Sequence, residues 1–186
     1  QVDDMVAWLI SISDPLLITH PEPNPGIGLW IPSAEQFGLH YAPNETPCML
    51  GLSLGDPHIF WTDDECDQIA AALGYLPEQS IDIYAGCNQL IDHYLLAHLA
   101  SHLAEQYDGM LDFDGAIQPP LRPGGHYTLE NYPWHTLEEI HEYVQSLPGI
   151  LHDIYYTVGN RRWVYHIGDA AFLRVWLAHP HFHLVK

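Results

Sequence analysis

The chain is 186 residues long and contains 24 acidic residues against five basic ones, which gives a formal net charge of -19. An electrostatic field of this sign repels nucleic-acid phosphates and anionic membranes, and it attracts cations and basic proteins. We therefore expect no direct binding of nucleic acid or membrane, although solubility alone also explains such a charge. The length favours a single domain over residues 1–186, with Pro-rich loop segments at 14–47 and 116–134 within it.

The cysteines indicate a reducing compartment. Cys48, Cys66 and Cys87 are odd in number and form no C-x-x-C pair. No apolar run approaches the roughly 20 residues that span a bilayer. The run Met5 to Ile12 lacks the basic flank of a signal peptide. The sequence therefore predicts a cytoplasmic protein.

Three segments of the N-terminal third have the composition of β-strands. Met5 to Ile12 is a continuous apolar run rich in β-forming residues, which predicts a strand buried on both faces. Gly28 to Ile31 lies among prolines, which remove backbone donors, and so predicts a short edge strand. Cys48 to Leu54 predicts the next strand.

Trp61 to Gly74 has the pattern of an amphipathic helix. Thr62 and Glu65 form a T-x-x-E capping box, and Asp63 and Asp64 fall in the first turn, where the helix dipole favours negative charge. The apolar stripe recurs at helical spacing, at Cys66, Ile69, Ala70 and Leu73.

Ser80 to Gly115 reads as strand, long helix and strand, and we expect the rest of the chain to be arranged around it. The helix is predicted from Asn88, its N-cap, to Tyr107. Its strongest apolar sector is formed by Leu96, Leu99, Leu103 and Tyr107. The opposite, polar side is formed by His98, Ser101, His102, Glu105 and Gln106.

The C-terminal third predicts a helix over Leu137 to Ser146, then two strands over Ile150 to Val158 and Arg161 to Ile167. Gly159-Asn160 between the strands is a hairpin turn signal. Asp169 is the expected cap of a final helix. Together the elements predict an α+β (mixed α/β) fold: a single domain with a mixed central sheet of about five to seven strands and about four helices on its faces.

A few residues have the spacing of a reactive site. His98 and His102 are four residues apart on the predicted helix, and Glu105 lies one turn further on, so the three are weak candidates for a zinc site. A solvated polar face explains them equally well. Cys87 begins a helix after a strand, a position that lowers the pKa of a thiol, but packing of a small buried residue explains it more simply. We expect no catalytic residues and no cofactor.

Two segments carry a resemblance to a known family. They are C-N-x-x-x-D-H, which contains Cys87, Asn88, Asp92 and His93, and the run from Asp169 to Pro180. With the surrounding sequence from Trp61 to Lys186, they resemble a bacterial family of unknown function (domain of unknown function 6368). The resemblance implies no catalytic residues. In size, acidity and α/β character the chain is similar to the immunity proteins that bacteria use against polymorphic toxins.

These observations predict a cytoplasmic immunity protein that binds and neutralises a cognate toxin, a basic protein and possibly a nuclease, through an acidic surface. Tryptophans would anchor the centre of the interface. The expected partner-binding residues are Asp56, Asp63, Asp64, Glu65, Asp67, Asp112, Asp114, Trp30, Trp61 and Trp134. The alternatives are a small enzyme, using Cys87 with a histidine or a His98/His102 metal site, and a regulatory acidic binding module.

Overall fold

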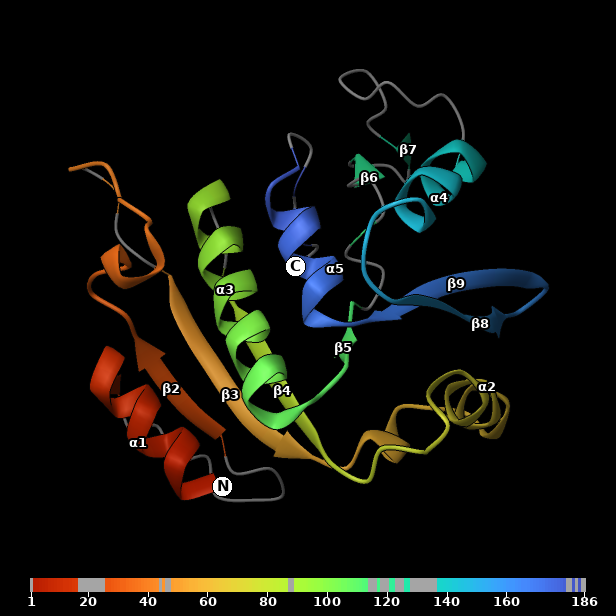
Figure 1. Ribbon diagram of the computed structural model, residues 1–186, viewed down its shortest axis with the longest axis horizontal. Helices are drawn as coiled ribbons and strands as arrows, with labels where there is room; N and C mark the ends of the chain where they lie inside the picture. The colour runs from red at the N-terminus through yellow and green to blue at the C-terminus, as the bar shows by residue number, and fades with distance from the viewer. Residues whose placement is uncertain are drawn as a thin grey trace. The chain divides into compact units, whose positions relative to one another are not determined.

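The computed structural model describes residues 2–16, 26–43, 45, 48–86, 89–113, 117, 121–122, 126–127, 137–179, 182 and 184. The fold is α+β, which confirms the predicted class (Figure 1). The chain forms two compact units. Unit 1 comprises Gln1–Thr62, Leu76–His98 and Lys186, and unit 2 comprises Asp63–Tyr75 and Leu99–Val185. A single domain over residues 1–186 stays a prediction.

The helices and strands of the described residues are as follows. The α-helices are α1 (Val2–Ile12), α2 (Asp63–Leu73), α3 (Leu90–Tyr107), α4 (Leu137–Gln145) and α5 (Ala170–Leu177), and the 3-10 helices are η1 (Glu35–Phe37) and η2 (Pro57–Ile59). The strands are β1 (Asp14–Leu16), β2 (Gly26–Trp30), β3 (Met49–Gly55), β4 (Ser80–Ala85), β5 (Leu111–Asp112), β6 (Leu121–Arg122), β7 (His126–Tyr127), β8 (Leu151–Val158) and β9 (Arg161–Gly168).

Unit 1 contains a four-stranded antiparallel sheet in the order β1-β2-β3-β4. Leu29 of β2 lies opposite Leu50 of β3, and both side chains are fully buried, as is Leu95 in the first half of α3. β3 confirms the strand predicted at Cys48 to Leu54. β2 was predicted as an edge strand, and that prediction is wrong, since β2 is hydrogen-bonded on both sides, to β1 and to β3.

The strand predicted at Met5 to Ile12 is also wrong, because these residues belong to helix α1. Met5 and Leu9, four residues apart, are buried, whereas Ala7 and Ile10 between and after them are exposed. That spacing is helical. A short run that is apolar at almost every position shows neither a period of two nor one of 3.6, so its periodicity cannot distinguish the two structures.

Unit 2 contains a three-stranded antiparallel sheet in the order β5-β9-β8. The predicted hairpin is confirmed: Val158 pairs with Arg161 on either side of the Gly159-Asn160 turn. The predicted cap of α5 is confirmed as well, because the Asp169 carboxylate accepts a hydrogen bond from the backbone N–H of Phe172 at 2.7 Å. Phe172 is fully buried in the core of this unit.

The single mixed central sheet is a wrong detail of the prediction. The described strands form sheets of four, three and two strands, and all their pairings are antiparallel. β4 pairs with β3, whereas β5 pairs with β9, so Ser80 to Gly115 is not a unit of two strands paired in one sheet. A hydrophobic pattern identifies a strand but does not identify its partner.

Helix α3 runs from unit 1 into unit 2, with residues 90–98 in the first and 99–107 in the second. Leu99 and Leu103 of the predicted apolar sector are buried. Ser101, which was predicted on the polar side, is buried too, so the division into an inner and an outer face is wrong at this position. Within the described residues, no helix is both long and apolar enough to cross a membrane.

Candidate functional site

The acids predicted to contact a partner occupy different environments. Asp63, Asp64 and Asp67 are exposed on α2, whereas Glu65 on the same helix is only 7 % exposed. The Glu65 side chain is therefore buried within unit 2, and a partner could not reach it as it could reach the three exposed acids. Burial raises the pKa of Tyr165, and the negative charges of Asp112 and Glu65 raise it further.

The other predicted contacts are placed only in part. Asp112 is exposed on β5, and Trp30 and Trp61 are half-buried. Asp114 and Trp134 lie outside the described residues, as does Cys87, so the structure says nothing of the thiol nucleophile that its position suggested.

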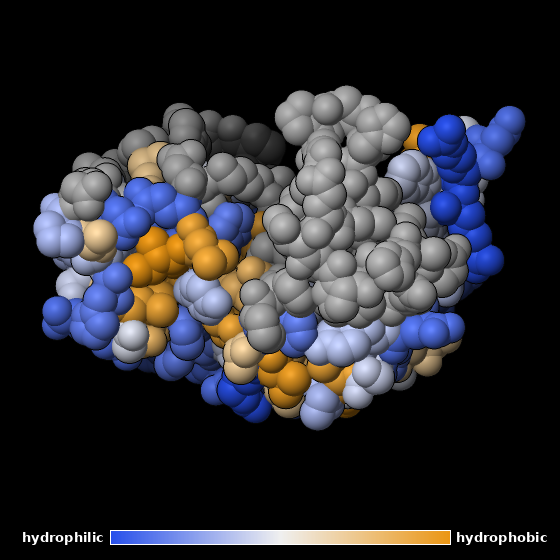
Figure 2. All heavy atoms as spheres, turned by 90° about the horizontal axis from the view of Figure 1, so that it is seen from above, coloured by the Kyte–Doolittle hydropathy of each residue, from blue (hydrophilic) through white to orange (hydrophobic). Residues whose placement is uncertain are grey.

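An exposed turn follows β3 in unit 1. We name residues 56–61 the η2 turn. Within it the Asp56 carboxylate accepts a hydrogen bond from the backbone N–H of His58 at 2.9 Å and so caps η2. Ile59 and Phe60 are 62 % and 68 % exposed. Figure 2 shows one face of the molecule, on which hydrophobic patches are bordered by hydrophilic residues.

The weak zinc candidates on α3 have other neighbours. The His98 ring stacks on Phe37, with 5.8 Å between ring centroids, and burial lowers the pKa of His98. Glu105 forms an ion pair with Arg174. In the described part of the chain, neither residue belongs to a group of three or more metal-ligating side chains whose donor atoms lie close together.

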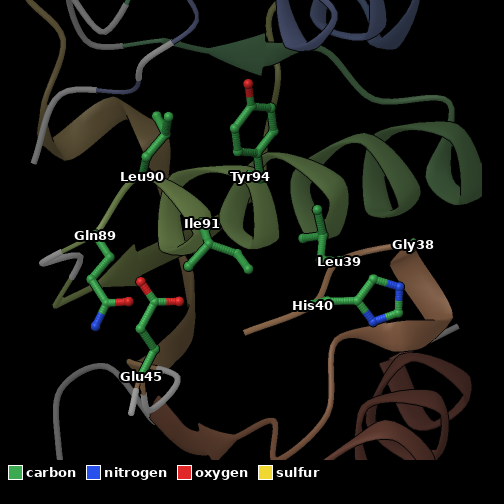
Figure 3. A pocket seen from close by; sticks show the side chains of 8 residues that line it. All are labelled: Gly38, Leu39, His40, Glu45, Gln89, Leu90, Ile91 and Tyr94. Carbon is green, nitrogen blue, oxygen red and sulfur yellow. The ribbon is translucent and has the colours of Figure 1, made fainter. Parts of the chain in front are cut away.

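An open hollow lies in unit 1 beside the start of α3 (Figure 3). Its lining is formed by Gly38, Leu39, His40, Glu45, Gln89, Leu90, Ile91 and Tyr94. The Glu45 carboxylate accepts a hydrogen bond from the backbone N–H of Ala42 at 2.8 Å, so this charge is held in a local turn. The other polar side chains of this lining are those of His40, Gln89 and Tyr94.

Three ligand-type side chains converge in unit 2. Asp153 of β8 lies directly opposite His166 of β9, and His141 comes from α4. Nε2 of His141 is 3.2 Å from one Asp153 oxygen, and Nε2 of His166 is 3.6 Å from the other. In the described part of the chain, only this group of three or more such residues has its ligand atoms within 4.8 Å of one another. We name these three residues the His/Asp/His cluster.

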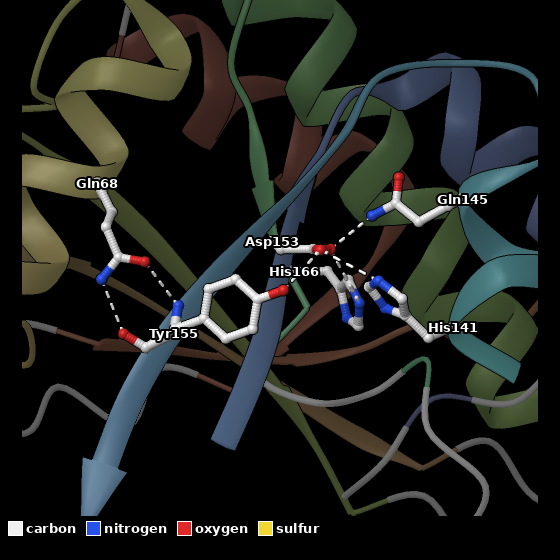
Figure 4. A network of polar contacts seen from close by, with 6 residues as sticks. All are labelled: Gln68, His141, Gln145, Asp153, Tyr155 and His166. Atoms are coloured by element: carbon white, nitrogen blue, oxygen red, sulfur yellow. Dashed lines mark hydrogen bonds and ion pairs between the residues drawn. The ribbon is translucent and has the colours of Figure 1, made fainter. Parts of the chain in front are cut away.

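Two neighbours fix the Asp153 carboxylate. Gln145, one turn after His141 on α4, donates its side-chain N–H to Oδ1 at 2.5 Å, and the Tyr155 hydroxyl donates to Oδ2 at 3.2 Å. Figure 4 shows these two groups and both imidazole rings directed at the carboxylate. Tyr155 is held in turn by two other residues. The guanidinium carbon of Arg162 lies 3.9 Å from the centroid of its ring. The side-chain amide of Gln68 donates a hydrogen bond to the backbone carbonyl of Tyr155 and accepts one from its backbone N–H. Burial raises the pKa of Tyr155, and Asp153 beside it raises the pKa further.

Comparison with known protein families gives one match. The Family of unknown function (DUF6368) matches residues 1–186. The chain belongs to this family. The family assignment predicted from Trp61 to Lys186 is thus confirmed, and it extends over the N-terminal third as well. No curated protein and no solved structure matches the chain. The likeness to immunity proteins stays a prediction.

In this DUF6368 chain, the His/Asp/His cluster was missed by sequence reasoning. Its members are separated by more than ten residues and match no spacing motif. One signal was present: the Gly159-Asn160 turn fixes the register of the hairpin and so places Asp153 opposite His166. Burial lowers the pKa of His166 to about 4, against an opposing contribution from Asp153, so its imidazole is neutral at pH 7.

Proposed function

We propose that this DUF6368 chain is a protein-binding module of the immunity-protein type, a cytoplasmic inhibitor that covers a basic bacterial toxin domain. The observation that carries the proposal is the η2 turn, which the Asp56 carboxylate caps and in which Ile59 and Phe60 are 62 % and 68 % exposed. Adjacent large apolar side chains that remain in water, with polar groups around them, are typical of a surface that a partner covers.

The turn is held in shape before any partner binds. The hydrogen bond from the His58 N–H to Asp56 closes its first half, and the His58 ring packs edge-on against Trp61 with 6.1 Å between centroids. Because a fixed turn loses little conformational entropy on binding, the part of the contact energy that is spent on ordering the turn is small. An exposed aromatic on such a turn fits the role of an anchor at the centre of an interface.

Charge favours a basic partner. The chain has a formal net charge of -19, and Asp63, Asp64 and Asp67 are exposed on α2 of unit 2. Complementary charge raises the association rate and makes it sensitive to salt. A nuclease toxin is a suitable target class because its nucleic-acid-binding surface is itself basic.

The proposal is tested with a toxin domain encoded directly beside the gene for this chain. Co-expression should restore the growth of cells that produce the toxin domain, and calorimetry should show a one-to-one complex. The association rate should fall as salt is raised. Continued toxicity, together with no complex at low salt, would refute the proposal.

Matched variants test the surface itself. Phe60→Ala should weaken the complex by at least tenfold, as the loss of an aromatic anchor does. Val158→Ala is the control, because Val158 is a comparably exposed apolar residue, at 61 %, on the β8–β9 hairpin. Asp56→Asn should mainly slow association. Equal effects of Phe60→Ala and Val158→Ala would show that the η2 turn is not the contact.

A further inference from the structure

We propose that the His/Asp/His cluster of unit 2 binds a divalent transition-metal ion, with Zn²⁺ as the best match. The cluster consists of His141, Asp153 and His166. The proposal does not depend on the proposed function, since it concerns different residues and is tested without a partner protein.

The distances between the donor atoms are close to those of a metal site. Zn–N and Zn–O bonds of about 2.0–2.2 Å place neighbouring ligand atoms of a tetrahedral site about 3.3 Å apart. The Nε2 atoms of His141 and His166 lie 3.2 Å and 3.6 Å from the two oxygens of Asp153. One ligand atom of each residue lies within 4.8 Å of the other two, which is close enough for the group to hold one ion.

The interior of the cluster contains an unsatisfied polar group. His166 is only 2 % exposed, and neither of its ring nitrogens has a hydrogen-bond partner among the residues that the structure describes. Buried polar atoms in folded proteins are almost always paired, so an unpaired imidazole beside a carboxylate requires an explanation. A metal ion supplies a partner for Nε2, the nitrogen that faces Asp153.

The surroundings of Asp153 are those of a ligand held in place. Gln145 donates to Oδ1 at 2.5 Å and Tyr155 donates to Oδ2 at 3.2 Å. A carboxylate has about four acceptor positions, so these two hydrogen bonds leave lone pairs for a metal. Hydrogen bonds of this kind orient metal ligands and strengthen binding.

The donor set selects the class of ion. Two imidazoles and one carboxylate suit Zn²⁺ and other first-row ions, whereas Mg²⁺ and Ca²⁺ prefer oxygen ligands alone. Access is from the His141 side, because the side chains of His141 and Asp153 are 35 % and 20 % exposed. Three protein ligands leave a fourth position for water.

The test uses the full chain after removal of metal with a chelator. Zn²⁺ binding is measured by calorimetry and by competition with a chromophoric chelator, and Co²⁺ is added separately to record the visible absorption bands of a four-coordinate ion. We expect one Zn²⁺ per chain with a dissociation constant below about 1 μM, and a rise in melting temperature, because an ion that binds only the folded state stabilises it.

Variants separate this site from other histidines. His141→Gln and Asp153→Asn alter the more exposed ligands, and circular dichroism checks that each variant folds. His152→Gln is the matched control, because residue 152 precedes Asp153 on β8 and its side chain points to the other face of the strand. A second control is the double variant His181→Gln/His183→Gln, which replaces two of the three histidines in the segment 179–183.

The outcomes are distinct. The proposal holds if His141→Gln and Asp153→Asn each weaken Zn²⁺ binding by at least tenfold and abolish the Co²⁺ bands, while both controls bind as the unmodified chain does. It is overturned if the unmodified chain shows no saturable binding, or if binding survives in His141→Gln and Asp153→Asn and is lost with His181 and His183.

Discussion

Oδ1 of Asp153 lies 3.6 Å from Nε2 of His166, its direct partner across the β8–β9 hairpin. Because the two residues are paired in the sheet, their side chains emerge on the same face and share the same neighbours. His141 approaches the second oxygen of this carboxylate, at 3.2 Å. The orientation of Asp153 therefore determines whether both imidazoles face a common point.

We expect Tyr155→Phe to weaken Zn²⁺ binding by about tenfold or more, which is the usual effect of losing a hydrogen bond to a metal ligand. The substitution removes only the hydroxyl that donates to Oδ2 of Asp153 at 3.2 Å. The ring that Arg162 covers is retained. Competition with a chromophoric chelator measures the change in affinity.

Tyr156→Phe is the control for this experiment. Tyr156 is the next residue on β8, and its side chain points to the opposite face of the strand, where its ring lies near Tyr165. We expect its Zn²⁺ affinity to equal that of the unmodified chain. If the two variants lose affinity equally, the Tyr155 hydroxyl does not position Asp153.

The pairing of two of the three cluster residues could be predicted from the sequence. The Gly159-Asn160 turn fixes which residues face each other, so counting back from it pairs Asp153 with His166. His141 could not be placed in this way, because α4 meets the hairpin through tertiary packing and no local pattern records where a helix docks. Sequence spacing favoured His98 and His102, which are four residues apart on α3. Among the described residues, neither belongs to a group of three or more metal-ligating side chains.

The same limit explains the misassigned residues elsewhere. Local signals were sufficient for the cap at Asp169 and for the stripe of α2, where Ile69 is buried. They were insufficient for Glu65, because a charged residue in a capping box is normally expected outside. Met5 to Ile12 was misassigned because its composition fits a strand and a helix alike.

The buried carboxylate of Asp92 is expected to have a structural role. It is 1 % exposed; Oδ1 accepts hydrogen bonds from the Tyr41 hydroxyl at 3.0 Å and the Cys48 N–H at 3.2 Å, and Oδ2 accepts one from the Gln89 N–H at 3.2 Å. Asp92→Ala leaves these donors unpaired, so we expect the free energy of unfolding to fall by about 3–5 kcal/mol in urea titrations. Tyr41→Phe removes one hydrogen bond and should cost about 1 kcal/mol. Similar losses in the two variants would argue against Asp92 as the centre of this network.

Two acids of α2 should behave differently although they are two residues apart. Glu65→Ala alters a side chain that is 7 % exposed, and we expect it to lower the free energy of unfolding by about 2 kcal/mol. Asp67→Ala alters an exposed side chain and should change it by less than about 0.5 kcal/mol. If Glu65→Ala is as stable as Asp67→Ala, the Glu65 carboxylate does not stabilise unit 2.

The pKa of His98 leads to a pH dependence of stability. Burial lowers this pKa below its ordinary value of 6.5, whereas the unfolded chain keeps the ordinary value. Between the two values the unfolded state binds more protons, so the contribution of His98 to stability is complete above pH 6.5 and is lost as the pH falls below it. NMR titration of the ring should give a midpoint below 6.5.

Phe37→Ala uncovers the His98 ring and should raise the midpoint of its titration. An unchanged midpoint would show that the contact with Phe37 does not cause the shift in pKa.

Gly149 should tolerate no side chain. Its φ of +111° is a conformation that other residues rarely adopt, and an added Cβ would lie 2.4 Å from the backbone nitrogen of Phe172. That nitrogen donates the hydrogen bond to Asp169 that caps α5, so Gly149→Ala should cost about 3 kcal/mol or more of unfolding free energy. Gly74→Ala is the matched control, because Gly74 has a φ of +80° and no atom of the described residues lies within 4 Å of an added Cβ. It should cost about 1 kcal/mol, from backbone conformation alone. The difference between the two variants in urea unfolding measures the clash with α5, and equal losses would show that α5 yields without cost.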